Sequence, residues 1–277
     1  MESKEQLTVY LYEIEKWEKD QKGLFFWEKI GRLPFKLIDK LTPKFIQEKI
    51  AVLVNELGSY VQTGGRYLIN EALMIKKISR FTSQPVENIT DIGKLPIQDM
   101  ISASNKLQSE RSKLAAVQGA TTGFGGIFTL AVDIPVILGM ALKTLQEIAI
   151  IHGYDPNEKQ ERVFIIKCLQ FASADIVGKE SILNELSMMH EKRDSAASMI
   201  SQLKGWQEVF FTYRDNFGLK KLFQMVPVVG MLFGAIINKG MMDDVAEAGI
   251  MLYRKRRIYD KLREIDKVES NVSTDSL

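Results

Sequence analysis

Apolar residues recur in steps of three and four along most of this chain, which is the period of an α-helix. The N-terminal segment shows the pattern clearly, with apolar side chains at Leu7, Tyr10, Leu11, Ile14 and Trp17. Similar spacing predicts helices in residues 97–118 and 241–267. No alternating apolar and polar run is long enough to suggest a strand. The pattern therefore predicts an all-α protein.

Two segments differ from the rest because they carry almost no charge. Residues 119–142 hold a single charged residue, Asp133, followed by Pro135, and residues 222–238 hold none. Each segment contains a proline and a pair of glycines four positions apart, a spacing that lets two helix backbones approach closely. We therefore expect a single multi-helix domain built around a central pair of glycine-rich apolar helices.

These two segments allow three interpretations. As membrane spans they are weak, because a span needs about 20 apolar residues and an aspartate near the bilayer centre costs roughly 2.5–3.5 kcal/mol. As helices that are apolar all round, they fit the buried core of a soluble protein. As reversible membrane elements, they pack inward in solution and contact lipid on demand. The sequence disfavours the first interpretation and leaves the other two open.

Asp133 needs a partner, because a carboxylate in an apolar stretch must be paired, hydrogen-bonded or protonated. Aspartate is a favoured N-cap, and proline fits the first turn of a helix. We therefore expect Asp133 to cap a helix that begins at Ile134 or Pro135. The segment then forms two helices, residues 114–131 and 134–152, with a bend between them. A functional charged site at Asp133 is the alternative.

Helix boundaries are also suggested further along the chain. Gly153 follows an apolar run and is a suitable residue to end a helix. Asp155, Pro156 and Glu158 then have the order of a helix start, with an acidic N-cap, proline at the first position and an acid at the third. Residues 82–96 contain turn signals and are predicted to form a loop.

No set of residues suggests catalysis, a metal ion or a cofactor. The single cysteine, Cys168, lies in an apolar helical run, where we expect a buried and unreactive thiol. His152 and His190 are 38 residues apart and lack neighbours with zinc-ligand spacing. The run GATTGFGG matches neither common phosphate-binding glycine motif. A formal net charge of +2 gives no support for nucleic-acid binding.

Two stretches combine positive charge with large apolar side chains. In residues 23–44, basic and aromatic residues alternate, which suits an interfacial contact with anionic lipid. The candidate contact residues are Phe25, Phe26, Trp27, Lys29, Arg32, Phe35 and Lys36. Residues 253–263 hold six basic residues and one acid. This second stretch fits a solvated helix face or attraction to a membrane surface, and fits nucleic acid less well.

The N-terminus lacks the continuous apolar segment of a secretory signal. The chain also has one cysteine, which is compatible with a reducing compartment. We therefore expect a cytoplasmic protein whose membrane contact is peripheral and made at the inner face of the cell membrane.

The central part of the chain resembles the EcsC family of bacterial proteins. The resemblance is carried by LP followed by an acid at residues 95–99, GA-x-TG-x-GG at 119–126, D-x-P at 133–135 and GYDP at 153–156. VPVVGMLFGAIIN and VAEAGIMLYRKR, later in the chain, are also similar to that family's second half. The family-typical positions are Gly119, Gly123, Gly126, Asp133, Pro135, Gly153 and Asp155. The family is named from a protein encoded beside an ATP-binding-cassette exporter, and the resemblance transfers no catalytic residue.

These observations predict a non-catalytic, membrane-associated accessory or lipid-binding protein of the EcsC type. We expect a helical aromatic-basic region in residues 1–45, an EcsC-like helical domain in 46–267 and a disordered tail in 268–277. The expected partners are anionic lipid and a membrane transporter or another protein. A small-molecule-binding protein or enzyme with a helical pocket around Asp133 is one alternative, and a soluble cytosolic scaffold is another.

Overall fold

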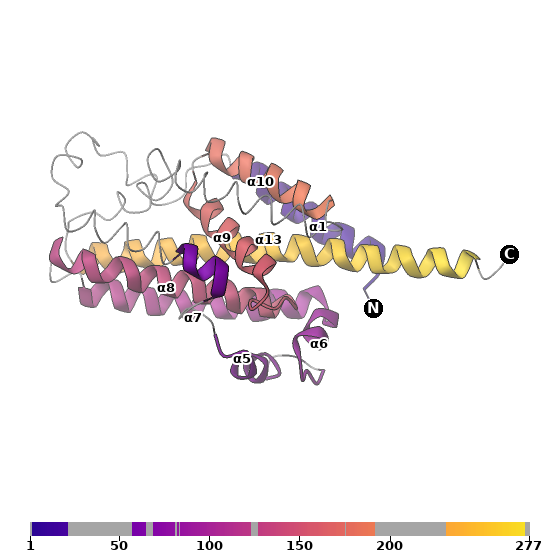
Figure 1. The fold of residues 1–277 in the computed structure, drawn as a ribbon, viewed down its shortest axis with the longest axis horizontal. Helices are drawn as coiled ribbons and strands as arrows, with labels where there is room; N and C mark the ends of the chain where they lie inside the picture. Colours follow the sequence, from indigo (N-terminus) through magenta and orange to yellow (C-terminus); the bar gives the residue numbers. More distant parts are fainter. Residues whose placement is uncertain are drawn as a thin grey trace.

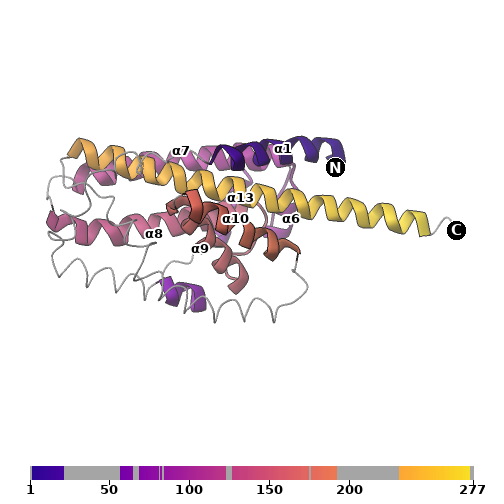
Figure 2. The ribbon, with the colours of Figure 1, turned by 90° about the horizontal axis from the view of Figure 1, so that it is seen from above.

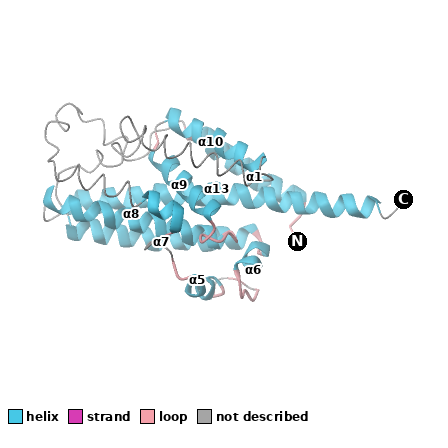
Figure 3. Ribbon diagram, in the orientation of Figure 1, coloured by secondary structure: helices cyan, strands magenta, loops and turns pink. Residues whose placement is uncertain are grey.

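The computed structural model describes residues 2–21, 57–64, 69–80, 82, 84–122, 127–174, 176–191 and 231–274. Its helices are α1 (Lys4–Asp20), α5 (Glu71–Ile78), α6 (Ile89–Lys94), α7 (Ile97–Thr122), α8 (Ile127–Ile151), α9 (Lys159–Ser173), α10 (Ile176–Glu191) and α13 (Met231–Thr274). Residues 57–63 are also helical. No strand occurs in these ranges (Figure 3), so the predicted all-α class is confirmed.

Three long helices form the body of the molecule. α7, α8 and α13 lie side by side, and α13 continues well beyond the other two toward the C-terminus (Figures 1 and 2). α9 packs on α8 and α13, and α10 packs on α9. α1 lies along α13, whereas α5 and α6 contact α8. The resulting bundle has one end where α7 stops and α8 and α13 begin, and another where α8 stops.

α1 forms where the first periodic run predicts a helix. The Ser3 hydroxyl accepts a hydrogen bond from the Gln6 backbone N–H, and the Gln6 side chain accepts one from the Ser3 N–H, which makes a capping box. Leu7 and Ile14 are fully buried, and Trp17 packs 5.4 Å from the Phe171 ring, centroid to centroid. The face predicted from the sequence is therefore the face that packs.

The prediction that a helix begins at Asp133 is wrong. α8 starts at Ile127 and runs through Asp133 and Pro135 without a break, so Asp133 lies in its second turn. Three of the four residues that separate α7 from α8 are glycines, each of which costs a helix about 1 kcal/mol relative to alanine. Together they oppose helix formation about as strongly as one interior proline, which costs about 3 kcal/mol.

The predicted start of the next helix is displaced by several residues. α8 ends in a Schellman motif, in which the Gly153 N–H bonds the Ile150 carbonyl at 2.8 Å and the Tyr154 N–H bonds the Ala149 carbonyl at 3.0 Å. Gly153 has φ +77° and ends the helix as predicted. Asp155, however, is not an N-cap.

The Asp155 carboxylate instead accepts hydrogen bonds from the backbone and side-chain amides of Asn157, at 2.8 Å each. This local turn uses the oxygen that an N-cap would direct at the helix, so α9 begins at Lys159 after Glu158.

Two further boundaries differ from prediction. The expected loop of residues 82–96 contains α6, whose first turn is capped by the Asn88 side chain through the Asp91 N–H at 2.9 Å. The C-terminal helix is also longer than expected, because α13 begins at Met231 inside the second uncharged segment. The segment predicted to be a disordered tail, residues 268–277, is helical as far as Thr274.

Candidate functional site

The C-terminus of α8 meets α13 at a buried cluster that we call the helix junction. It contains Gly93, Gly153, Tyr154, Glu161, Arg256 and Arg257. The Arg257 guanidinium donates hydrogen bonds to the His152 carbonyl at 2.7 Å and to the Gly153 carbonyl at 3.0 Å. The last carbonyls of a helix lack internal partners and carry partial negative charge, so this arginine caps α8.

Gly153 allows two backbone segments and Arg257 to meet in this junction. A Cβ atom at Gly153 would lie against the Cα of Gly93, 2.7 Å from the Gly93 nitrogen and 2.9 Å from an Arg257 nitrogen. α6, which carries Gly93, therefore touches the end of α8 through backbone contact that requires glycine at position 153.

A buried ion pair completes the junction. The Arg256 guanidinium binds the Glu161 carboxylate at 2.8 and 2.5 Å, and their side chains are 10% and 3% exposed. The same guanidinium lies 4.1 Å from the centroid of the Tyr154 ring, and the Tyr154 hydroxyl donates to Asp260 at 2.7 Å. These contacts fix α9 and the α8–α9 turn to α13, because a desolvated two-point pair tolerates little displacement.

The titratable groups beside the junction are held in inert states. Burial raises the pKa of the Cys168 thiol above its usual value, so the thiol stays protonated, in line with the predicted unreactive cysteine. Burial also lowers the pKa of His152 to about 3, and its Nδ1 lies 2.8 Å from the Ile148 carbonyl oxygen. The junction therefore offers structural contacts and no activated nucleophile.

Most of the basic side chains in residues 253–263 have acidic partners within the molecule, whereas Arg263 is exposed. Apart from the junction arginines, Arg254 lies 3.9 Å from Glu13, Lys255 binds Glu18 at 2.7 Å and Lys261 binds Glu2 at 2.9 Å. Their positive charges are thus matched inside the molecule, mainly by α1.

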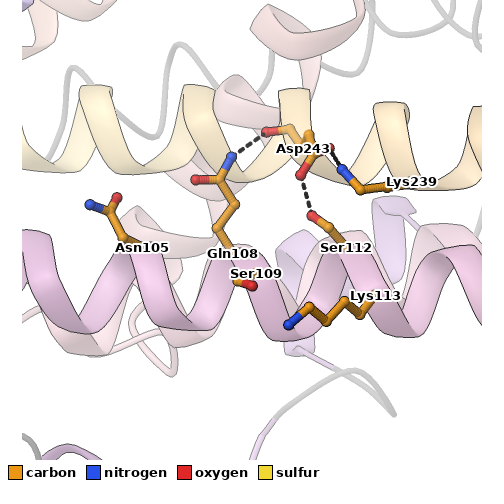
Figure 4. Close-up of a pocket in the computed structure, with 7 residues that line it drawn as sticks. All are labelled: Asn105, Gln108, Ser109, Ser112, Lys113, Lys239 and Asp243. Atoms are coloured by element: carbon orange, nitrogen blue, oxygen red, sulfur yellow. Dashed lines mark hydrogen bonds and ion pairs between the residues drawn. The ribbon is translucent and has the colours of Figure 1, made fainter.

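A second feature is a polar groove of about 260 Å³ between α7 and α13. Figure 4 shows its lining residues: Asn105, Gln108, Ser109, Ser112 and Lys113 from α7, and Lys239 and Asp243 from α13. Three of these side chains bind Asp243. Ser112 donates to its carboxylate, Lys239 binds the carboxylate at 2.6 Å, and the Gln108 amide donates to its backbone carbonyl at 3.2 Å.

Three other groups in the groove remain available. Asn105, Ser109 and Lys113 follow one another at intervals of four residues and so form one row on α7. All three are exposed, and none has a hydrogen-bond or ion-pair partner in the part of the chain that the structure describes. The row therefore presents an amide, a hydroxyl and an ammonium group to a ligand.

The third feature is an apolar end of the bundle, formed by Leu114, Val117, Val136 and Ile236, which are 42–61% exposed. The Asn238 amide donates to Gln118 at 3.2 Å, which places the start of α13 beside the last turns of α7. α8 begins four residues after α7 and packs back along it, and the Arg111–Glu147 ion pair gives the register of this antiparallel pair. At a rise of 1.5 Å per residue, Val136 then lies within roughly 8 Å of Val117 along the bundle axis.

The structure separates the predicted site residues. Gly119 is buried near the apolar end, whereas Gly153 and Asp155 lie at the junction end. Asp133 and Pro135 lie within α8, and the structure describes their backbone but not their side chains. The remaining candidates lie outside the described residues: Gly123, Gly126, Phe25, Phe26, Trp27, Lys29, Arg32, Phe35 and Lys36.

The described residues contain neither a metal-ligand cluster nor a membrane-spanning helix. Among the described residues, no group of three histidines, cysteines or acids is placed to hold a metal ion. No helix within the described ranges is both long and apolar enough to cross a bilayer.

Comparison with known proteins identifies the family. The model of the EcsC protein family matches residues 9–258. This chain is an EcsC family member. It is 54% identical over 267 residues to "Uncharacterized protein YdbA" of Bacillus subtilis (strain 168), covering 96% of this chain and 98% of that relative. It is 28% identical over 185 residues to "Protein EcsC" of the same organism, covering 66% and 75%. No solved structure matches the chain.

The EcsC match includes both the groove and the junction as far as Arg257. Sequence reasoning missed both features because each joins helices far apart in the chain. The only local signal was the spacing of Asn105, Ser109 and Lys113, which places them on one helix face. That spacing does not reveal that α13 lies next to the row.

Proposed function

We propose that this EcsC family member is a non-catalytic accessory protein that binds reversibly to anionic membranes at the cytoplasmic face. The observation that carries the proposal is the apolar end of the bundle. Half of the strongly exposed large apolar side chains in the described residues lie there, while the others are scattered over α1, α5 and the far end of α13. Clustered exposed apolar side chains mark interaction surfaces, whereas scattered ones need no explanation.

The size of the apolar end favours a reversible attachment. Full burial of a Val, Leu or Ile side chain contributes about 1.5–3 kcal/mol, so four half-exposed side chains contribute roughly 4 kcal/mol. That energy corresponds to about a thousandfold partition, which is weaker than a single myristoyl chain provides. Stable binding therefore needs a second contribution from positive charge. Residues 25–36 remain predicted as one source.

The partner side of the proposal rests on the family resemblance. Because the family takes its name from a protein encoded beside an exporter, a membrane transporter is the protein partner we expect. The matched charges of residues 253–263 argue that such a partner does not bind there unless α1 leaves α13.

Vesicle flotation tests the membrane proposal. We expect the protein to float with phosphatidylglycerol-containing vesicles at low salt and to float less with pure phosphatidylcholine vesicles. Val117→Asp should reduce flotation at least tenfold, because it removes apolar area and places a charge at the lipid surface. Val268→Asp is the matched control, since both valines are 61% exposed and Val268 lies at the opposite end of α13.

The control variant should float within twofold of the wild type. Wild-type protein that stays with the soluble fraction at low salt would overturn the proposal. Equal losses in the two variants would show that the apolar end is not the contact.

A further inference from the structure

We propose that the polar groove between α7 and α13 binds the phosphate group of an anionic phospholipid. The inference rests on the proposed membrane binding and assigns its charge-dependent part to particular residues. The groove residues that carry it are Ser109, Lys113 and Lys239.

The first argument is the position of the groove relative to the apolar end. Lys113 lies four residues before Val117 on α7, and Lys239 lies three residues after Ile236 on α13. Residues at these spacings share a helix face. On both helices, therefore, a groove lysine is set back from an exposed apolar side chain by about one turn, roughly 4.5–6 Å. When the apolar side chains enter lipid, both ammonium groups lie at the depth of the headgroup phosphates.

The second argument is charge. The groove contains two cations, Lys113 and Lys239, and one anion, Asp243, which leaves one net positive charge. The Asp243 carboxylate is already bound by Lys239 and Ser112, so it is not available to hold a cation. Lys113 has no acidic partner within the described residues. An anion is the complementary ligand.

The third argument is the volume of the groove and the hydrogen-bond donors that line it. The groove volume of about 260 Å³ is below the 300–1,000 Å³ of pockets that enclose drug-sized ligands. It accommodates a phosphate with part of its glycerol and is too small for a nucleotide. The Ser109 hydroxyl, one turn before Lys113 (Figure 4), has no partner in the described residues and can donate to a phosphate oxygen together with the ammonium.

A lipid is favoured over a soluble phosphate ester because of the groove's surroundings. Exposed apolar side chains border the groove on both helices, at Val117 on one and Ile236 on the other. A soluble ester would leave those side chains in water, whereas a phospholipid covers them with its acyl region.

The test compares Lys113→Gln with Lys143→Gln in flotation with phosphatidylglycerol vesicles. Lys143 is an exposed lysine on α8 outside the groove, and the α7–α8 register places it within about one turn of Lys113 along the axis. Loss of a lysine that acts only through general surface attraction reduces binding about fivefold. We expect Lys143→Gln to lose no more than that and Lys113→Gln to lose at least tenfold more than Lys143→Gln.

Ser109→Ala is the second variant, because it removes one phosphate donor without changing charge. It should weaken flotation about fivefold while leaving the thermal unfolding curve unchanged. Circular dichroism of each variant should match the wild type, since the exposed groups of Ser109 and Lys113 have no partners in the described residues.

Each result has one meaning. Equal losses in Lys113→Gln and Lys143→Gln, with the wild type floating, overturn the groove and leave the membrane proposal intact. Failure of the wild type to float overturns both. A third arm uses sn-glycerol 3-phosphate without vesicles in titration calorimetry. Micromolar binding that Lys113→Gln abolishes would assign the groove to a soluble ester and overturn the lipid assignment.

Discussion

At the residue scale, the end of α8 depends on one position, Gly153, where a side chain would collide with neighbouring atoms. Gly153 combines a left-handed φ of +77° with close backbone contact to Gly93. A larger residue at 153 would also displace Arg257, whose guanidinium caps the same turn. One glycine thus determines whether the turn, α6 and α13 can meet.

Gly153→Ala should lower the free energy of unfolding by about 3 kcal/mol. About 1–2 kcal/mol comes from forcing alanine into the left-handed region, and the rest from overpacking against Gly93 and Arg257. Gly58→Ala is the control, because a Cβ at Gly58 meets nothing within 4 Å and the residue lies in helical segment 57–63. This control should stabilise the protein by about 0.5–1 kcal/mol in urea unfolding. Similar changes in both variants would contradict the proposed strain at Gly153.

At the element scale, the sequence predicts which segments are helical better than where each helix starts. α1 was predicted correctly because the helical spacing of its apolar residues is visible in the local sequence, and the same residues are buried against the rest of the protein. The start of α8 was not, because Asp133 and Pro135 have the order of a helix start, whereas α8 begins at Ile127 and continues through both residues. The junction was beyond prediction, since Arg257 contacts carbonyls 105 and 104 residues away.

Pro135→Ala tests the continuity of α8. Proline inside a helix removes one backbone hydrogen bond and clashes with the preceding turn, so alanine should stabilise the protein by about 1–3 kcal/mol. Pro96→Ala is the contrasting variant, because Pro96 precedes α7 and its fixed φ restricts the unfolded chain there. Chemical unfolding should show a small loss for Pro96→Ala. A comparable loss for Pro135→Ala would mean that a helix begins at Pro135 after all.

At the scale of the whole molecule, the end of the bundle that holds the helix junction differs in its contacts from the apolar end. α1 binds along α13 through Glu18–Lys255 and a Trp17–Glu247 hydrogen bond of 2.6 Å, and Glu2, just before α1, pairs with Lys261. Glu2 also accepts a hydrogen bond from the Ile97 N–H at the start of α7, at 2.8 Å. The charged and aromatic groups at this end are therefore used to join the helices. Exposed apolar side chains gather toward the opposite end, where Lys113 lies one turn from Val117 on α7, and this is where we place the membrane contact.

The buried His152, at the helix-junction end, makes the stability of the folded protein depend on pH. Burial, together with the nearby cations Arg257 and Arg254, lowers its folded-state pKa to about 3, against an unfolded value of about 6.5. Between these values the unfolded chain holds a proton that the folded protein does not, so stability falls as pH falls below about 6.5. The slope is about 1.4 kcal/mol per pH unit, or roughly 2 kcal/mol lost by pH 5.

Urea unfolding at pH 5, 6 and 7 measures this contribution. His152→Gln keeps a donor for the Ile148 carbonyl but removes the titrating group. We expect the variant to be less stable than the wild type at pH 7 and to lose correspondingly less stability between pH 7 and pH 5. Because the ring is fully buried between α8 and α13, protonation requires the packed end to open, and the effect should therefore appear in global unfolding. An unchanged slope in His152→Gln would show that other groups carry the acid sensitivity.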